Sequence, residues 1–314
     1  MPGRLSLAAS IPLLAALLAV PIRAQDAGGA KPAHAAGKEG KAKGEKAAKA
    51  AHHDVKPDGN RGAGILHASR LFDAELVFAD GRGAGKVADV VLDPSDGRIQ
   101  YAVLDAGSFT DAQGKLSAVP VDALGADTAS AQIKLVGIDK TALVAAPAFD
   151  KAEWPKDGDR DFVAKVWKQF GREPYWDDKA TGFGTLRLST LMKTTLHDAK
   201  GEELGQVDNF AVDLVHGKVL YAIVHPPAST NAGEPAGDKA ANPGKAAEAQ
   251  AERRVAVPWA VLAKGAASGK LVLDMDPARF LMAPSFAGSQ WPLMSDGAWV
   301  ASNDAFYSEA AAAR

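Results

Sequence analysis

The chain contains an internal repeat, which constrains its fold more than any other feature of the sequence. The motif Gly-x-Val at Gly85 recurs at Gly205, and Tyr101 recurs as Tyr221 with the same spacing of 120 residues. Self-similarity at a fixed spacing is typical of a chain built from copies of one structural unit. We therefore expect two similar domains in succession.

The later part of the repeat has a longer spacing, which locates an insertion. The Val-Pro pair at Pro120 recurs at Pro258, a spacing of 138 residues, so the second copy holds 18 additional residues. They fall within 226–252, a stretch without Val, Ile, Leu, Phe, Trp or Tyr. Because such a segment has little to bury, we predict an exposed, disordered loop. The copies extend over residues 65–155 and 185–292.

Each copy is predicted to consist of short β-strands. Residues 86–93 and 98–105 are rich in β-branched side chains and too short for helices. Residues 94–97 between them are typical of a tight hairpin turn, in which Gly97 suits a positive φ angle. Several short strands separated by glycine turns suit a small closed barrel. The predicted fold class is all-β, with two small barrels in tandem.

An aromatic segment follows each predicted barrel, over the linker 156–184 and the C-terminal tail 293–314. Phe162 and Val166 have the spacing of one helix face, and either Asp159 or Asp161 suits the N-cap. We predict short aromatic helices that pack onto the barrels or join them. An exposed docking patch is the alternative.

The repeat separates the aromatic residues into two groups. Four recur in both copies and are assigned to packing, because a contact that closes a barrel is needed twice: Phe149, Phe286, Trp154 and Trp291. The others show no such register, and they form the predicted partner surface: Trp167, Tyr175, Trp176, Trp299 and Tyr307. Trp and Tyr are favoured as anchors of protein interfaces.

Residues 1–24 have the features of a cleaved secretory signal peptide. Arg4 precedes an uncharged apolar run over 5–20, Pro21 ends the run, and Ala24 is a suitable cleavage site. An uncleaved anchor is the alternative, although a spanning helix needs roughly 20 apolar residues. We expect a periplasmic or secreted protein with no transmembrane span after cleavage.

Residues 25–64 are predicted to form a disordered tether, because Ala, Gly and Lys dominate them. The lysines favour weak contact with anionic surfaces, whereas their wide spacing favours a plain solvated spacer.

Composition and motifs exclude several classes of function. The chain has no cysteine, which excludes thiol chemistry and cysteine metal sites, and its formal net charge of -2 argues against nucleic-acid binding. The Gly-rich stretch that ends at Lys86 lacks the Ser or Thr of a phosphate-binding loop, and no His of the predicted folded region lies at metal-ligand spacing. We predict no catalytic residue, no metal and no cofactor. Asp89 matches Asn209, which favours a hydrogen-bonding role over acid–base chemistry.

The repeated pattern resembles the PRC-barrel family. In both copies a Ser-x-Leu segment precedes a Gly-(Lys/Gln)-Val strand, a hairpin that ends in Tyr-Ala-(Val/Ile), and a Val-Pro pair. This family is named for the H subunit of the photosynthetic reaction centre and includes a ribosome-maturation factor. The resemblance implies a small β-barrel that serves as an assembly or adaptor module without catalysis. The membrane helix of the H subunit is absent here, and the export signal argues against a ribosomal role.

These features favour an exported, non-enzymatic scaffold that binds a partner protein in the cell envelope. The alternative is a periplasmic sensor or carrier that holds a small ligand between the two barrels. The alternative predicts a partly apolar pocket, lined with polar groups, where the barrels meet.

Overall fold

The computed structural model describes the chain from residue 60 onward, with gaps. The described residues are 60, 63–107, 109, 114–127, 130, 132–176, 183–227, 243–266 and 269–312. The predicted signal segment 1–24 lies outside them, as do most of the tether 25–64 and part of the loop 226–252. None of the described helices is both long and apolar enough to cross a bilayer.

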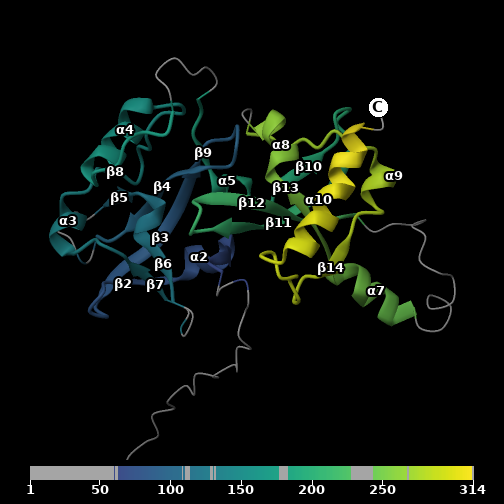
Figure 1. The fold of residues 1–314 in the computed structure, drawn as a ribbon, viewed down its shortest axis with the longest axis horizontal. Coiled ribbons are helices and arrows are strands. Elements are labelled where there is room, and N and C mark those ends of the chain that lie inside the picture. Colours follow the sequence, from purple (N-terminus) through teal and green to yellow (C-terminus); the bar gives the residue numbers. More distant parts are fainter. Residues whose placement is uncertain are drawn as a thin grey trace, which may run out of the picture. The chain divides into compact units, whose positions relative to one another are not determined.

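The strands of the described residues form two sheets (Figure 1). The first has eight strands in the order β6-β7-β2-β3-β4-β5-β8, with β9 paired to β3. Its strands are β2 (Glu75–Val77), β3 (Gly83–Leu92), β4 (Ile99–Asp105), β5 (Lys115–Val119), β6 (Leu124–Ala126), β7 (Ile133–Leu135), β8 (Ala148–Asp150) and β9 (Leu186–Arg187). Neighbouring strands are antiparallel, apart from β2 and β7, which are parallel.

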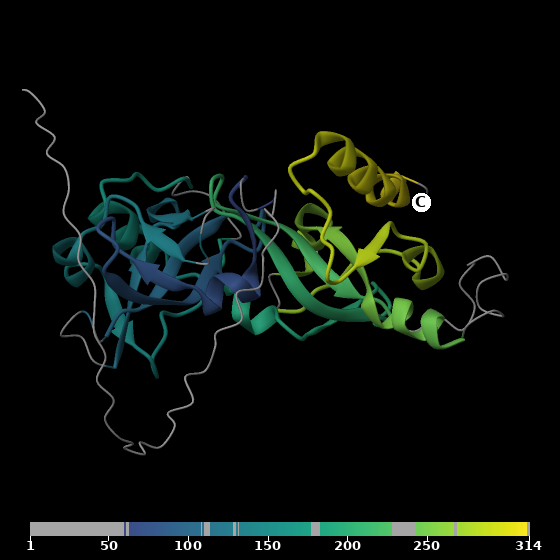
Figure 2. The same cartoon turned by 90° about the horizontal axis from the view of Figure 1, so that it is seen from below.

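The second sheet has six strands in the order β1-β11-β12-β13-β14, with β10 paired to β11. Its strands are β1 (Ile65–His67), β10 (Thr195–His197), β11 (Glu203–Asp213), β12 (Lys218–His225), β13 (Arg253–Pro258) and β14 (Ser285–Ala287). Figure 2 shows these strands mainly in green, with the C-terminal helix in yellow beside them.

Short helices connect and cover the strands. They are α2 (Ala68–Asp73), the 3-10 turn η1 (Val121–Ala123), α3 (Lys140–Val144), α4 (Arg160–Gln169), α5 (Leu188–Leu191), α7 (Pro243–Glu252), α8 (Trp259–Ala266), α9 (Pro277–Phe280) and α10 (Gly297–Ala312). Helix α7 occupies the last part of the predicted loop 226–252, so this part is helical although it carries no large apolar side chain. Residues 228–242 of that loop lie outside the described residues.

The central hairpins of the two sheets, β3–β4 and β11–β12, share one register. Lys86 pairs with Asp105, and Gln206 pairs with His225, 120 residues later; the register shifts after Val87 and likewise after Val207. The repeated glycine has a steric cause. Gly85 and Gly205 have φ angles of +108° and +149°, and a Cβ on either would collide with the carbonyl of the paired strand. Only glycine allows the backbones to approach this closely.

The hairpin turns confirm the role predicted for Gly97, and an aspartate stabilises each of them. Gly97 has a φ angle of +74°. The Asp93 carboxylate accepts from the Ser95 amide at 2.9 Å, and Asp213 accepts from the Val215 amide at the same distance. Each aspartate therefore stabilises its turn by capping a backbone amide.

The segments that enter the two copies are exchanged between the sheets. Strand β1 belongs to the first copy in sequence but pairs with β11, and β9 belongs to the second copy but pairs with β3. In Figure 1, helix α2, in dark blue, lies beside the green strand β11, and residues of the two elements are in contact. Periodicity alone did not predict this exchange.

Polar contacts fix the exchanged segments at equivalent positions. The Asn209 carboxamide oxygen accepts from the Ser69 amide at 3.2 Å, and the Asp89 carboxylate accepts from the Ser189 amide at 3.0 Å. These contacts confirm the hydrogen-bonding role predicted for Asp89. The Arg187 guanidinium also donates to Asp89 at 2.9 Å, and Asp89 is completely buried.

The two sheets share one hydrophobic core, because each exchanged helix buries a leucine in it. Leu71 of α2 and Leu191 of α5 belong to the same cluster as Ile99 and Phe210. The tips of the two hairpins also pair directly. The Ile99 amide donates to the Gly217 carbonyl at 2.8 Å, and the Val219 amide donates to the Gly97 carbonyl at 2.9 Å. We call this junction the seam.

Candidate functional site

Three of the five residues predicted for the partner surface lie together. The Trp167 and Tyr175 rings are 5.5 Å apart between centroids, Tyr175 and Trp176 are 5.0 Å apart, and Phe183 lies 4.9 Å from Trp176. We call these four residues the aromatic cluster. Trp167, Tyr175, Trp176 and Phe183 are all half-buried.

Helix α4 and the segment after it position this cluster. The Asp159 carboxylate accepts from the Phe162 amide at 2.9 Å and caps the helix, while Val163 and Val166 bury its inner face. The helix, its cap and its spacing agree with the sequence prediction. Trp167 donates through Nε1 to the Gln100 carbonyl at 2.7 Å, which fixes the orientation of the indole.

The β3–β4 hairpin also fixes Tyr175. Its hydroxyl donates to Asp93 at 3.0 Å and accepts from the Gln100 side chain at 3.3 Å. Burial and the nearby Asp93 carboxylate raise the pKa of Tyr175 above its ordinary value, because both disfavour a phenolate. Tyr175 therefore acts as a neutral donor over the physiological pH range.

The remaining two predicted surface residues lie elsewhere. Tyr307 is only 2% exposed and belongs to the shared core, so its assignment to a surface is wrong. Trp299 packs edge-on against Tyr221 with centroids 5.3 Å apart, just as Phe162 packs against Tyr101 at 5.5 Å. Trp299 therefore has a counterpart in the first copy, which the comparison of sequences missed because the two residue types differ.

The four residues predicted to pack do so in equivalent pairs. Phe149 contacts Trp154 with centroids 5.0 Å apart, and Phe286 contacts Trp291 at 6.4 Å. All four are half-buried against the small clusters beneath α4 and α10.

A groove lies at the seam, beside Trp167. It has a volume of about 350 Å³, and elements of both sheets line it. Ile99, Val121, Trp167 and Val215 supply apolar surface, and Gly217 comes from the hairpin turn of the second sheet. We call this hollow the seam groove. Its size lies at the lower end of the range for small-ligand sites.

Charged groups surround the seam groove, and most of them are paired. Arg172 contacts Asp122 at 2.7 Å, and His216 contacts Asp213 at 2.7 Å. The Arg98 guanidinium lies 4.5 Å from the centre of the Tyr175 ring, which joins the groove to the aromatic cluster. The groove thus combines an apolar floor with polar groups at its rim.

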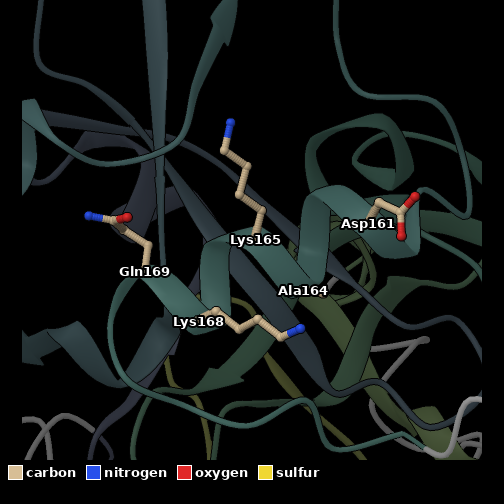
Figure 3. A pocket seen from close by; sticks show the side chains of 5 residues that line it. All are labelled: Asp161, Ala164, Lys165, Lys168 and Gln169. Carbon is tan, nitrogen blue, oxygen red and sulfur yellow. The ribbon is translucent and has the colours of Figure 1, made fainter.

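A second hollow, on the outer face of α4, has a different character. Asp161, Ala164, Lys165, Lys168 and Gln169 line it, and Figure 3 shows that the side chains drawn there point in different directions. Side chains that diverge from a single helix face do not converge on a ligand, so we assign no site to it.

The described residues offer no metal-binding cluster. Within this part of the chain, no three His, Asp or Glu side chains lie close enough together to hold a metal ion. The glycine-rich stretch before Lys86 begins at Gly81 in a turn and continues into strand β3 from Gly83 onward.

Apart from Trp167, the residues of the seam groove were not predicted from the sequence. Arg98, Val215 and Gly217 belong to hairpin turns, and Arg172 belongs to the linker. One signal was available: Val121 and Trp259 both follow the repeated Val-Pro pair, so a valine and a tryptophan occupy equivalent positions.

Comparison with known proteins identifies one domain. Residues 64–140 match the family model of the PRC-barrel domain. The chain therefore contains a PRC-barrel domain in its first copy, as the sequence motifs indicated. No curated protein matches the chain.

Proposed function

We propose that this chain is a non-enzymatic scaffold of the cell envelope, built from two PRC-type barrels, and that it binds a partner protein at the seam groove and the aromatic cluster. One observation carries the proposal. Trp167 belongs both to the predicted partner surface and to the wall of the groove where the two sheets meet. Half-buried aromatic residues beside a groove are typical of interface anchors.

The proposal of a second barrel is supported by the pairing of strands. The register of β11 with β12 repeats that of β3 with β4, including the position of the β-bulge. The capped turns, the exchanged segments and the aromatic contacts of the trailing helices recur as well. A degenerate second copy would explain why the family model matches residues 64–140.

Export is supported by the apolar run and the cleavage site within residues 1–24. A tether over 25–64 would let the folded part reach a partner at some distance from an envelope surface. Periplasmic or secreted localisation follows from the same features.

Affinity capture tests the function. The chain from Gln25 onward serves as bait for a native envelope fraction, beside its Trp176→Ala variant. We expect the wild-type bait to retain a protein at defined stoichiometry and the variant to retain at least tenfold less. Phe109→Ala is the matched control, because Phe109 is 37% exposed and lies outside the aromatic cluster. Equal capture by both variants would contradict the assignment of the surface.

The volume of the groove favours a second candidate function, a sensor or carrier of a small ligand. Sites for small ligands begin at roughly 300 Å³, and the seam groove has about 350 Å³. A ligand that copurifies with the mature chain and is released on denaturation would favour this function over the scaffold.

A further inference from the structure

The two sides of the seam differ at one pair of equivalent residues. Val121 and Trp259 each follow the repeated Val-Pro pair, and each faces the glycine of the opposite hairpin. A Cβ placed on Gly97 would lie 2.6 Å from the Trp259 ring, and one placed on Gly217 would lie 2.9 Å from the Val121 side chain. The backbone is therefore similar on the two sides of the seam, but a tryptophan packs against the glycine on one side and a valine on the other.

Trp259 fills its side completely. Its side chain is 2% exposed, and Nε1 donates to the Pro94 carbonyl at 3.3 Å. The indole thus seals the junction over Gly97 and satisfies its own polar atom.

Val121 leaves the other side open. The seam groove lies over Val121 and Gly217, and Val215 at its rim is 67% exposed. The groove therefore lies at the position equivalent to the Trp259 ring. The Trp259 ring at the equivalent position indicates that a group of indole shape fits the groove.

The filling group must come from another molecule. The residues outside the described part of the chain contain no Phe, Trp or Tyr, so no segment there is able to supply a ring of indole size. The Trp167 ring is held in the wall of the groove by its hydrogen bond to Gln100.

We propose that the seam groove binds one planar aromatic ring of about indole size, the side chain of a tryptophan in the partner protein. This inference rests on the proposed function and names the group that is recognised. The ring lies over Gly217 as Trp259 lies over Gly97. The guanidinium groups of Arg98 and Arg172, which line the groove, lie beside its face.

Calorimetric titration of the mature chain tests the inference. N-acetyl-tryptophanamide serves as the probe, and N-acetyl-leucinamide is the matched apolar control. We expect the tryptophan derivative to bind at one site per chain, at least tenfold more tightly than the leucine derivative. Equal affinities, or binding of free indole without binding of N-acetyl-tryptophanamide, would overturn the inference, because the second result points to a free small molecule.

Two variants locate the binding. Val121→Trp places an indole in the groove from within, and Val215→Glu places a charge at its exposed rim. We expect each to weaken the probe at least tenfold. Val144→Trp is the control, because Val144 is 57% exposed and lies outside the groove. If Val121→Trp fails to fold, Val215→Glu decides alone, and unchanged affinity in that variant overturns the inference.

The same variants separate this inference from the proposed function. If the partner is captured equally by wild type and Val215→Glu but is lost with Trp176→Ala, the scaffold stands and the ring site is wrong. If no partner is captured while the probe binds, the scaffold fails and the groove recognises another source of tryptophan.

Discussion

The guanidinium carbon of Arg187 lies 3.6 Å from the centre of the Trp154 ring, although the two residues belong to different copies of the repeat. His67 stacks on Trp291 at the equivalent place, with ring centroids 3.4 Å apart. Each trailing tryptophan is thus covered by the entry segment of the other copy. The packing role of these tryptophans was predicted from the sequence. The strand exchange that brings Arg187 and His67 to them was not.

Replacing Asp89 should destabilise the fold more than replacing its neutral counterpart. Asp89 is completely buried and accepts from Arg187 and Ser189, so Asp89→Ala leaves these donors without a partner. We expect a loss of about 3 kcal/mol in the free energy of unfolding, against about 1 kcal/mol for Asn209→Ala. Chemical denaturation measures both, and equal losses would show that the ion pair contributes nothing.

Truncating Trp259 should open the filled side of the seam. Trp259→Val removes a ring that is 2% exposed, and we expect a cost of about 3 kcal/mol or more. Because the new cavity has the shape of the lost ring, added indole should raise the melting temperature of the variant more than that of the wild type, which offers the seam groove alone. A variant that melts like the wild type would contradict the packing assigned to Trp259.

The two halves of the chain should fold together and not singly. Removal of residues 177–182 gives fragments 25–176 and 183–314, each of which holds the entry segment that the other sheet needs. Apart, Leu71 and Leu191 lose the core that buries them. We expect little cooperative melting from either fragment and recovery of a one-to-one complex on mixing, measured by circular dichroism and gel filtration. A monomeric fragment with a cooperative melt would contradict the exchange.

Stability should fall at high pH. The chain has four tyrosines, and burial raises the pKa of each of them above 10.0: Tyr101, Tyr175, Tyr221 and Tyr307. The unfolded chain releases these protons first, so it binds fewer protons than the native state and stability declines as pH rises. The contribution is complete below pH 10 and is lost above it.

Phenolate absorbance provides the measurement for this decline. We expect the four tyrosines to ionise together with unfolding, well above pH 10. A tyrosine that titrates near its ordinary pKa while the circular dichroism spectrum stays native would contradict the burial of that residue.

The exported protein should begin near Gln25. The basic, apolar and small-residue regions of 1–24 predict cleavage after Ala24. N-terminal sequencing of the protein from the envelope fraction checks this, and an intact Met1 in a membrane pellet would indicate an anchor.

The hairpins, their turns and helix α4 could be predicted because their signals are local. β-Branched runs, a glycine with positive φ and an aspartate cap each act over a few residues. The exchange of β1 and β9 has no local signal, since Ser69 finds an equivalent acceptor in either copy, Asp89 or Asn209.

The candidate site was predicted in part for the same reason. Trp167, Tyr175 and Trp176 were recognisable as aromatic residues without a repeated partner. The groove beside them depends on how two distant turns meet, at Gly97 and Gly217, and periodicity does not describe that contact. Tyr307 was misplaced because its burial comes from tertiary packing of α10.

The buried ring of Trp259 affects how many partners one chain is able to bind at a time. A duplicated fold with two open sides would offer two equal positions and would be able to cross-link its partners. If the seam groove binds a partner tryptophan, the chain is a monovalent acceptor, because Trp259 seals the other side. Trp259→Val would then open a second position of the same shape, and one chain would bridge two partners.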